Sequence, residues 1–112
     1  MKTGIELILN ERARQRLSKS QGGEGWTDRH DDKHNCGEMA RAAACYAMQS
    51  VYGAIHDGSV AYREAAPPAG FLGWPWEEEW WKPKSAVEDL VRAGALIAAE
   101  IDRLQRLKGD GK

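Results

Sequence analysis

The sequence predicts a small, mainly all-α domain, in which three amphipathic helices form a bundle and two long aromatic and polar loops join them. Apolar residues recur at three- and four-residue steps in three separate segments, which is the period of a helix with one buried face. Glycine- and proline-rich stretches lie between these segments and break them. The length of 112 residues fits one domain. We expect residues 1–108 to form it and residues 109–112 to be a disordered tail.

The first helix is expected from about Thr3 to Ser18. Thr3-x-x-Glu6 is a capping box, in which two side chains satisfy backbone N–H groups at the helix start. Three glycines within residues 21–25 end the helix, because glycine loses the most chain entropy when it is ordered. The apolar residues of this segment form one stripe: Ile5, Ile8, Leu9, Ala13 and Leu17.

The second helix is expected from about Cys36 to Ile55, after an Asn35-x-x-Glu38 capping signal. Three alanines at 42–44 make it narrow enough for a neighbouring helix to approach closely. Residues 56–73 carry turn signals and form the longest irregular segment, with a short edge strand or β-hairpin near 59–63 as an alternative. The predicted core face of the helix consists of Met39, Ala42, Ala43, Tyr46, Ala47, Val51 and Ile55.

The third helix follows Pro83 and begins with the capping box Ser85-x-x-Glu88. We expect Gly109 to end it. Two favourable four-residue charge pairs, Glu88/Arg92 and Asp102/Arg106, are expected along it. Its broad apolar stripe consists of Val87, Leu90, Val91, Gly94, Ala95, Ile97, Ala98, Ile101 and Leu104.

The charge balance and the apolar pattern exclude some classes of function. Sixteen basic and seventeen acidic residues give a net charge of -1, which argues against binding to bulk nucleic acid but leaves room for one local charged pocket. No apolar run approaches the ~18 residues of a membrane span. The first residues lack the apolar core of a secretory signal. A domain of this size buries only about two-thirds of its unfolded surface, so a homo-oligomer would add stability.

Two cysteines indicate the compartment. If Cys36 and Cys45 lie on one helix, nine positions separate them by about 13 Å. A disulfide needs Cα atoms within about 7 Å. We therefore expect reduced thiols, two small buried side chains, and a cytoplasmic protein.

The segment between the first two helices concentrates polar groups, with two histidines and three aspartates close together. One interpretation is a site that binds an anion or reads a base. A second is a metal site, because His30, His34 and Glu38 would share one face of a continuous helix. A third is structural: Asp31 or Asp32 caps the next helix, and the histidines bond to backbone or carboxylate groups.

Residues 73–83 hold four of the five tryptophans within eight positions. One interpretation is a lid that folds back and completes the core, since a buried indole covers up to ~250 Å². The other is a stacking platform for a flat ring such as a nucleobase, with Lys82 near a phosphate. The two interpretations are compatible if two of the indole rings pack inward and two face a pocket.

The charges of the third helix admit a magnesium site. Carboxylates that face each other across a bundle can hold Mg²⁺, and the candidates are Glu38 with Asp89 or Glu100. The alternative is a solvated charged face. Arg92 lies in the same part of this helix, beside small residues, close to neighbouring backbones.

Several motifs together carry a family resemblance: Gly25-Trp26-Thr27, His30-Asp31-Asp32-x-His34, Trp74-Pro75-Trp76, Trp81-Lys82-Pro83 and the run Asp-Leu-Val-Arg-Ala-Gly-Ala-Leu-Ile at 89–97. With them the chain resembles a family of small proteins encoded by bacteriophages and prophages, which implies origin more than activity. Members are sometimes labelled MazG-like, which would imply an all-α, Mg²⁺-dependent nucleoside triphosphate pyrophosphohydrolase. The Glu-Glu-x-x-Glu motif of that enzyme is absent here. Residues 11–34 also resemble the ryanodine-receptor repeat (RyR) domain, which implies a nucleotide-type ligand.

The favoured function is a phage-type binding module that holds, and in an anti-defence role sequesters, a nucleotide-like anionic small molecule such as a host signal nucleotide. We expect binding without turnover and without a cofactor. One alternative is a Mg²⁺-dependent hydrolase that uses Glu38, Asp89 and Glu100. Another is a host-protein interaction module that docks through the tryptophan-rich loop. The expected ligand contacts are Arg14, Trp26, His30, Asp31, Asp32, His34, Trp74, Trp76, Lys82 and Arg92.

Overall fold

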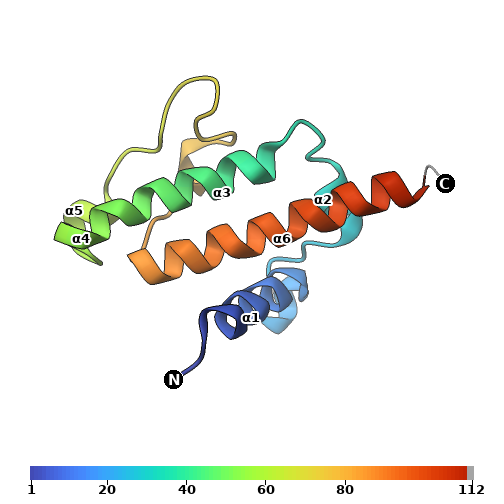
Figure 1. Cartoon of the computed structure of the whole chain (residues 1–112), viewed down its shortest axis with the longest axis horizontal. Coiled ribbons are helices and arrows are strands. Elements are labelled where there is room, and N and C mark those ends of the chain that lie inside the picture. Colours follow the sequence, from blue (N-terminus) through green and yellow to red (C-terminus); the bar gives the residue numbers. More distant parts are fainter. Residues whose placement is uncertain (111–112) are drawn as a thin grey trace.

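The computed structural model describes residues 1–110 and shows a helical domain with no strand in that range. Its three long helices are α1 (Gly4–Arg16), α3 (Glu38–Gln49) and α6 (Ala86–Asp110). Helix α6 lies in the middle, with α3 on one side and α1 on the other (Figure 1). The predicted, mainly all-α fold is confirmed. Short helical pieces interrupt the connections: η1 (Lys19–Gln21), α2 (Asp28–Asp32), η2 (Ser50–Tyr52), α4 (Gly53–His56), α5 (Val60–Arg63) and η3 (Glu78–Trp80).

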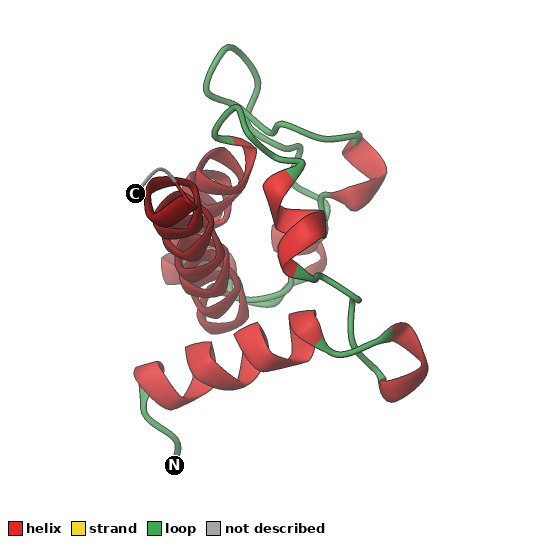
Figure 2. Ribbon diagram, turned by 90° about the vertical axis from the view of Figure 1, so that its right-hand side faces the viewer, coloured by secondary structure: helices red, strands yellow, loops and turns green. Residues whose placement is uncertain are grey.

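The connecting segments gather on one side of the α3–α6 pair, as Figure 2 shows. The other side of this pair carries no covering segment in the described part of the chain. The molecule therefore has a loop side and a bare helical side. None of the helices within residues 1–110 combines the length and the apolar composition needed to cross a bilayer.

Helix α1 begins as predicted but packs differently. The Thr3 hydroxyl accepts the Glu6 N–H at 3.2 Å, and the Glu6 carboxylate accepts the Thr3 N–H at 3.2 Å, so the capping box is confirmed. The predicted apolar stripe is mostly wrong as a docking face, because Ile5 and Leu9 are 81% and 66% exposed. The buried residues of α1 are Arg12 and Gln15.

Two tertiary contacts explain this orientation of α1. Ile8 lies against Gly94 of α6 so closely that a Cβ on Gly94 would come within 2.5 Å of the Ile8 Cδ1 atom. Arg12 meets Asp31 at 3.1 Å in a buried ion pair. The gap at Gly94 and the buried charge pair therefore select the docking face, rather than the helix's own apolar stripe.

The predicted helix from Cys36 to Ile55 is divided. Gly37 has a left-handed φ of 77°, and α3 begins only after it, at Glu38. The Glu38 carboxylate accepts the Cys36 N–H. Beyond Gln49 the chain tightens into η2 and then α4, so Val51 and Ile55 leave the core and are 72% and 81% exposed.

The core forms where α3 crosses α6. Alanines on both helices are buried, and their small side chains let the backbones approach closely, as the run at 42–44 predicts. Both cysteines are free thiols: Cys45 is buried and Cys36 is exposed, so only one of them is the buried filler expected. The buried cluster consists of Met39, Ala42, Ala43, Cys45, Tyr46, Trp81, Ala93, Leu96 and Ala99.

Helix α6 starts at its predicted cap and ends later than predicted. The Ser85 hydroxyl accepts the Glu88 N–H at 3.2 Å. The helix continues through Gly109 to Asp110, so Gly109 does not end it. Residues 111 and 112 lie outside the described range.

Residues 59–63 form a helical turn, not the strand or hairpin given as an alternative. The Ser59 hydroxyl accepts the Tyr62 N–H at 3.2 Å and caps α5. Tyr62 is buried, and its hydroxyl donates to Asp89 at 2.6 Å. This local cap, together with the anchor on α6, fixes the segment as helix.

Candidate ligand pocket

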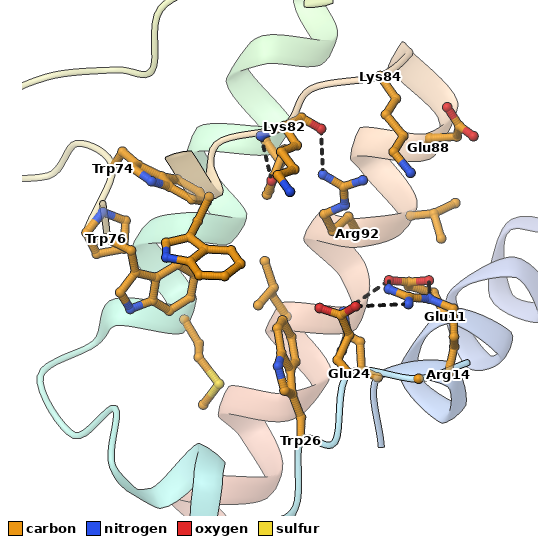
Figure 3. A pocket seen from close by; sticks show the side chains of 18 of the residues that line it. Glu11, Arg14, Glu24, Trp26, Trp74, Trp76, Lys82, Lys84, Glu88 and Arg92 are labelled. Atoms are coloured by element: carbon orange, nitrogen blue, oxygen red, sulfur yellow. Dashed lines mark hydrogen bonds and ion pairs between the residues drawn. The ribbon is translucent and has the colours of Figure 1, made fainter. Parts of the chain in front are cut away.

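Side chains from both predicted loops line one open pocket of about 1240 Å³. It lies between α1, α6 and residues 74–84 (Figure 3). One part, the aromatic wall, consists of Trp26, His30, His34, Tyr46, Trp74, Trp76 and Trp80. The other part, the ionic wall, consists of Glu11, Arg14, Lys19, Glu24, Glu77, Glu78, Lys82, Lys84, Glu88 and Arg92.

Local hydrogen bonds place the first half of the aromatic wall. The Thr27 hydroxyl caps α2 by accepting the His30 N–H at 3.2 Å. The His30 ring then stacks on Trp26, with centroids 5.2 Å apart and planes 8° from parallel. Asp31 accepts a hydrogen bond of 2.9 Å from His30 Nδ1, which requires the tautomer with its proton on that nitrogen.

A ring contact joins the two loops. His34 meets His30 edge to face at 5.1 Å and meets the Trp76 ring at 5.1 Å. Trp74 continues the row, with its ring perpendicular to Trp76 at 5.4 Å. The histidine loop and the tryptophan loop therefore converge on the same pocket. Their convergence makes the predicted site geometrically available; ligand binding there stays a prediction.

The tryptophans divide between core and pocket. Trp81 is 8% exposed and donates its indole N–H to the Ala65 carbonyl at 2.9 Å, so it belongs to the core. Trp74, Trp76 and Trp80 line the pocket, and the rings of Trp74 and Trp76 also pack against the core cluster. The Trp76 indole N–H is buried and has no hydrogen-bond partner among the described residues.

The ionic wall includes the cationic side chains of Arg92, Lys82 and Lys84, which form no ion pair with a carboxylate that the structure describes. Arg92 donates to the Lys82 carbonyl at 2.8 Å and lies over the Tyr46 ring, 4.7 Å from its centroid. The Lys82 ammonium lies 5.6 Å from the centroid of the Trp80 ring. Lys84 also lines the pocket, and only its backbone N–H is bonded, to Asp89. These groups carry positive charge next to flat rings.

Arg14 differs because two carboxylates hold it. Glu11 accepts two hydrogen bonds from its guanidinium, at 2.8 and 2.9 Å, and Glu24 accepts a third at 3.2 Å. Burial raises the pKa of Glu11, but the hydrogen bond and charge of Arg14, with the charge of Arg92, lower this pKa below its usual value. Arg14 therefore lines the pocket, as predicted, with its charge already balanced.

The imidazole of His34 is neutral at neutral pH. Burial lowers its pKa first, and the nearby His30 lowers it further, while Glu38 at 3.6 Å only partly opposes these effects. A neutral ring is suited to stacking and to a single hydrogen bond. It gains a positive charge when the pH falls.

Asp31 and Asp32 do not line the pocket, contrary to the sequence prediction. Asp31 is fully buried and bonds to Arg12 and His30. Asp32 forms an ion pair with Arg106 of α6 at 2.7 Å. Neither aspartate caps α3, whose N-cap residue is Gly37. Their carboxylates hold the frame of the pocket through these contacts.

The carboxylates of the magnesium alternative are not brought together. Asp89 is buried and accepts hydrogen bonds from the Tyr62 hydroxyl and the Lys84 N–H, and burial raises its pKa more than these bonds lower it. Glu100 is bonded to Arg103 at 2.7 Å. Asp89 and Glu100 are eleven positions apart on α6, or about 16 Å. They cannot share one ion with Glu38.

The alternative metal face on His30, His34 and Glu38 also differs from the structure. Helix α2 ends at Asp32 and α3 begins at Glu38, so no continuous helix aligns these three side chains. Within residues 1–110, no group of three histidine, cysteine, aspartate or glutamate residues has a geometry that could hold a metal ion.

The predicted ligand contacts omit many of the lining residues, and Tyr46, Trp80 and Lys84 are the most informative of these. Tyr46 was assigned only to the core face, although its ring also forms the pocket wall beside Trp74, 5.4 Å away. Trp80 lines the pocket, although the sequence distinguishes it in no way from the other tryptophans of residues 73–83. Lys84 follows the Trp81-Lys82-Pro83 motif, and the alternation of lysines around this proline was the available signal.

No protein-family model, no curated protein and no solved structure matches this chain. The interpretation of the pocket therefore depends on its own residues.

Proposed function

We propose that this chain is a small-molecule binding module whose ligand is a nucleotide-like anion. One observation carries the proposal: a single pocket joins an aromatic wall to the cationic side chains of Lys82, Lys84 and Arg92, which form no ion pair with a described carboxylate. Figure 3 shows Lys82 and Arg92 between the indoles of Trp74 and Trp76 and the Glu11–Arg14–Glu24 group.

Each wall suits one half of a nucleotide. Stacking of a base on an aromatic ring contributes about 1–3 kcal/mol. Phosphate oxygens accept charge-assisted hydrogen bonds from lysine and arginine. Ligand pockets usually measure about 300–1,000 Å³. The pocket here, at about 1240 Å³, has room for a base, a sugar and phosphates together.

Binding without turnover fits the placement of the acidic residues. Asp89 and Glu100, two of the carboxylates suggested for a hydrolase, are about 16 Å apart along α6 and are engaged by Tyr62 and Arg103. In a phage-encoded cytoplasmic protein, which the resemblance implies, such a module would sequester a host signal nucleotide and so act against host defence.

A host-protein interaction module is the second candidate, and one observation favours it. Phe71 and Leu72, in the loop before the tryptophans, are 91% and 71% exposed. Apolar side chains this exposed are typical of contact sites. A Phe71→Ser variant that keeps nucleotide binding and loses a host partner would assign that second role to this loop.

The proposed function is tested by calorimetric titration of the full chain with purine and pyrimidine nucleoside mono-, di- and triphosphates, each with Mg²⁺ and with EDTA. We expect saturable binding in both conditions and unchanged nucleotide in a chromatographic assay. Release of pyrophosphate or phosphate that EDTA abolishes would establish the hydrolase alternative. No binding of any nucleotide would contradict both.

A matched pair of variants locates the binding. Lys82→Ala combined with Lys84→Ala should weaken nucleotide binding and flatten its dependence on salt, because fewer ions are released from the complex. Lys33→Ala removes an exposed lysine that does not line the pocket and should leave both unchanged. If the double variant and Lys33→Ala weaken nucleotide binding equally, the phosphates do not bind at Lys82 and Lys84.

A further inference from the structure

The bare side of α6 carries a row of large apolar side chains. Leu90, Ile97, Ile101 and Leu104 are 49%, 50%, 49% and 48% exposed. Their spacing of seven, four and three residues places them on one face of the helix, as at the seam positions of a coiled coil. The described part of the chain leaves this face, which we call the α6 seam, without a covering segment (Figures 1 and 2).

Helix α1 extends the seam on the side away from the pocket. Leu7, Glu11 and Arg14 line the pocket, while Ile8 contacts α6. By helical geometry, Ile5 and Leu9 project from the opposite flank of α1, and both are strongly exposed. The apolar surface therefore spans two adjacent helices and leaves the pocket open.

The area of this surface suits an interface. Burying a Leu or Ile side chain contributes ~2.5 kcal/mol, at ~25 cal/mol per Å² of apolar surface. A fully exposed side chain of this kind therefore offers on the order of 100 Å² of apolar surface. At their exposed fractions the six side chains then offer on the order of 340 Å², which is the size of the largest apolar patch on a typical protein, and such a patch is often functional. A standard interface buries ~800 Å² per partner, of which a little over half is apolar.

The spacing of the seam points to a second copy of the chain as its occupant. Leu90 and Leu104 each lie seven positions from Ile97, so these three residues are placed symmetrically about Ile97. A two-fold axis requires a surface that is complementary to itself. The four seam residues carry no charge that would repel an identical copy. Antiparallel helices also oppose their macrodipoles favourably.

We propose that two copies pack α6 against α6 in an antiparallel homodimer, with Ile97 next to the two-fold axis. Leu90 of one protomer then faces the partner's Leu104. The two ligand pockets open away from the interface, so each protomer keeps a complete site. This inference is independent of which ligand the pocket binds.

The mass in solution tests the dimer. Sedimentation equilibrium of the full chain should give twice the 12.5 kDa of one chain, with dissociation only on dilution. Ile97→Glu combined with Ile101→Glu should give a folded monomer with unchanged helical circular dichroism. Phe71→Glu, which places the same charge on an exposed apolar residue off the seam, should stay dimeric. A wild type that is monomeric up to millimolar concentration, or a dimer that the seam variant retains, would overturn the proposal.

Disulfide trapping tests the orientation and remains informative if the charged variant fails to fold. In a Cys36→Ser background, Ile97→Cys should crosslink to itself under mild oxidation. Leu90→Cys should crosslink only when it is mixed with the Leu104→Cys chain. Self-crosslinking of Leu90→Cys and of Leu104→Cys separately would mean parallel helices and contradict the proposed arrangement.

Discussion

The regions around the two ends of α6 use charged residues in opposite ways. Around the carboxyl-terminal half, charged groups of α1, α2 and α6 are paired: Arg12 with Asp31 at 3.1 Å and Arg106 with Asp32 at 2.7 Å. At the amino-terminal half, Arg92 and the nearby lysines face the pocket and have no carboxylate partner among the described side chains. The carboxyl-terminal region is therefore held together by its ion pairs, whereas the amino-terminal region presents its positive charges to the pocket.

Burial explains the difference. Arg12 and Asp31 are 8% and 0% exposed, so each needs the other to offset the loss of water. Lys82 and Lys84 are exposed, and water solvates their charge until an anion replaces it. Paired charges thus build a frame, whereas solvated charges are available to a ligand.

Breaking the paired half should have the largest effect. Asp31→Ala leaves the buried Arg12 charge only the half-exposed Asp102 carboxylate at 3.6 Å, which should lower the free energy of unfolding by up to about 3–5 kcal/mol. Urea denaturation followed by circular dichroism measures this loss. The control Asp32→Ala removes a half-exposed carboxylate and should cost at most about 1 kcal/mol. Equal losses for the two variants would contradict the assigned roles.

Changing the pocket half should affect binding before stability. Trp76→Ala removes a ring of the aromatic wall, and the loss of about 1–3 kcal/mol of stacking corresponds to roughly 5- to 150-fold weaker nucleotide binding. Isothermal calorimetry measures the affinity, and circular dichroism checks that the helices persist. Phe71→Ala, an exposed aromatic residue outside the pocket, is the matched control and should bind normally. If Trp76→Ala unfolds the chain, its ring is core and not platform.

The histidine that joins the two loops should couple stability to pH. The pKa of His34 lies below its usual 6.5 in the folded chain. The unfolded chain therefore binds its proton more readily, and the free energy of unfolding should fall as the pH drops below about 6.5. His34→Gln should reduce this slope in urea titrations at several pH values. The control is His56→Gln, which should leave the dependence of the free energy of unfolding on pH unchanged. If His34→Gln also leaves it unchanged, His34 is not responsible.

The smallest effect should come from freeing Arg14 from one of its two carboxylate partners, so that its charge can contact a ligand. Glu24→Gln removes one of the two carboxylates that hold Arg14. An exposed ion pair contributes about 0.2–1 kcal/mol, so an anionic ligand should bind at most about 5-fold more tightly. Calorimetry with the same nucleotide checks this. Weaker binding would mean that Glu24 itself contacts the ligand.

Local chemistry made part of this molecule predictable from sequence. The caps at Thr3 and Ser85 follow from hydrogen bonds within three residues, and both helices begin there. The density of rings and imidazoles in two loops indicated one shared pocket, and His34 and Trp76 do meet.

Long-range contacts set the rest. The apolar spacing of α1 favoured burying Ile5 and Leu9, but Arg12 is buried instead because its partner, Asp31, lies nineteen positions away. The charge pair expected between Asp102 and Arg106 is replaced by contacts from Arg106 to Asp28 and Asp32 of α2. Such choices depend on which helices meet, and spacing along one segment does not contain that information.

The most direct test of the central claim separates the two walls by ligand chemistry. The full chain is titrated calorimetrically with ATP, with adenosine, which has the ring and no phosphate, and with tripolyphosphate, which has the charge and no ring. We predict that ATP binds more tightly than either fragment, because only ATP engages the aromatic wall and the free cations together. Binding of tripolyphosphate as tight as that of ATP, or no binding of ATP, would contradict it.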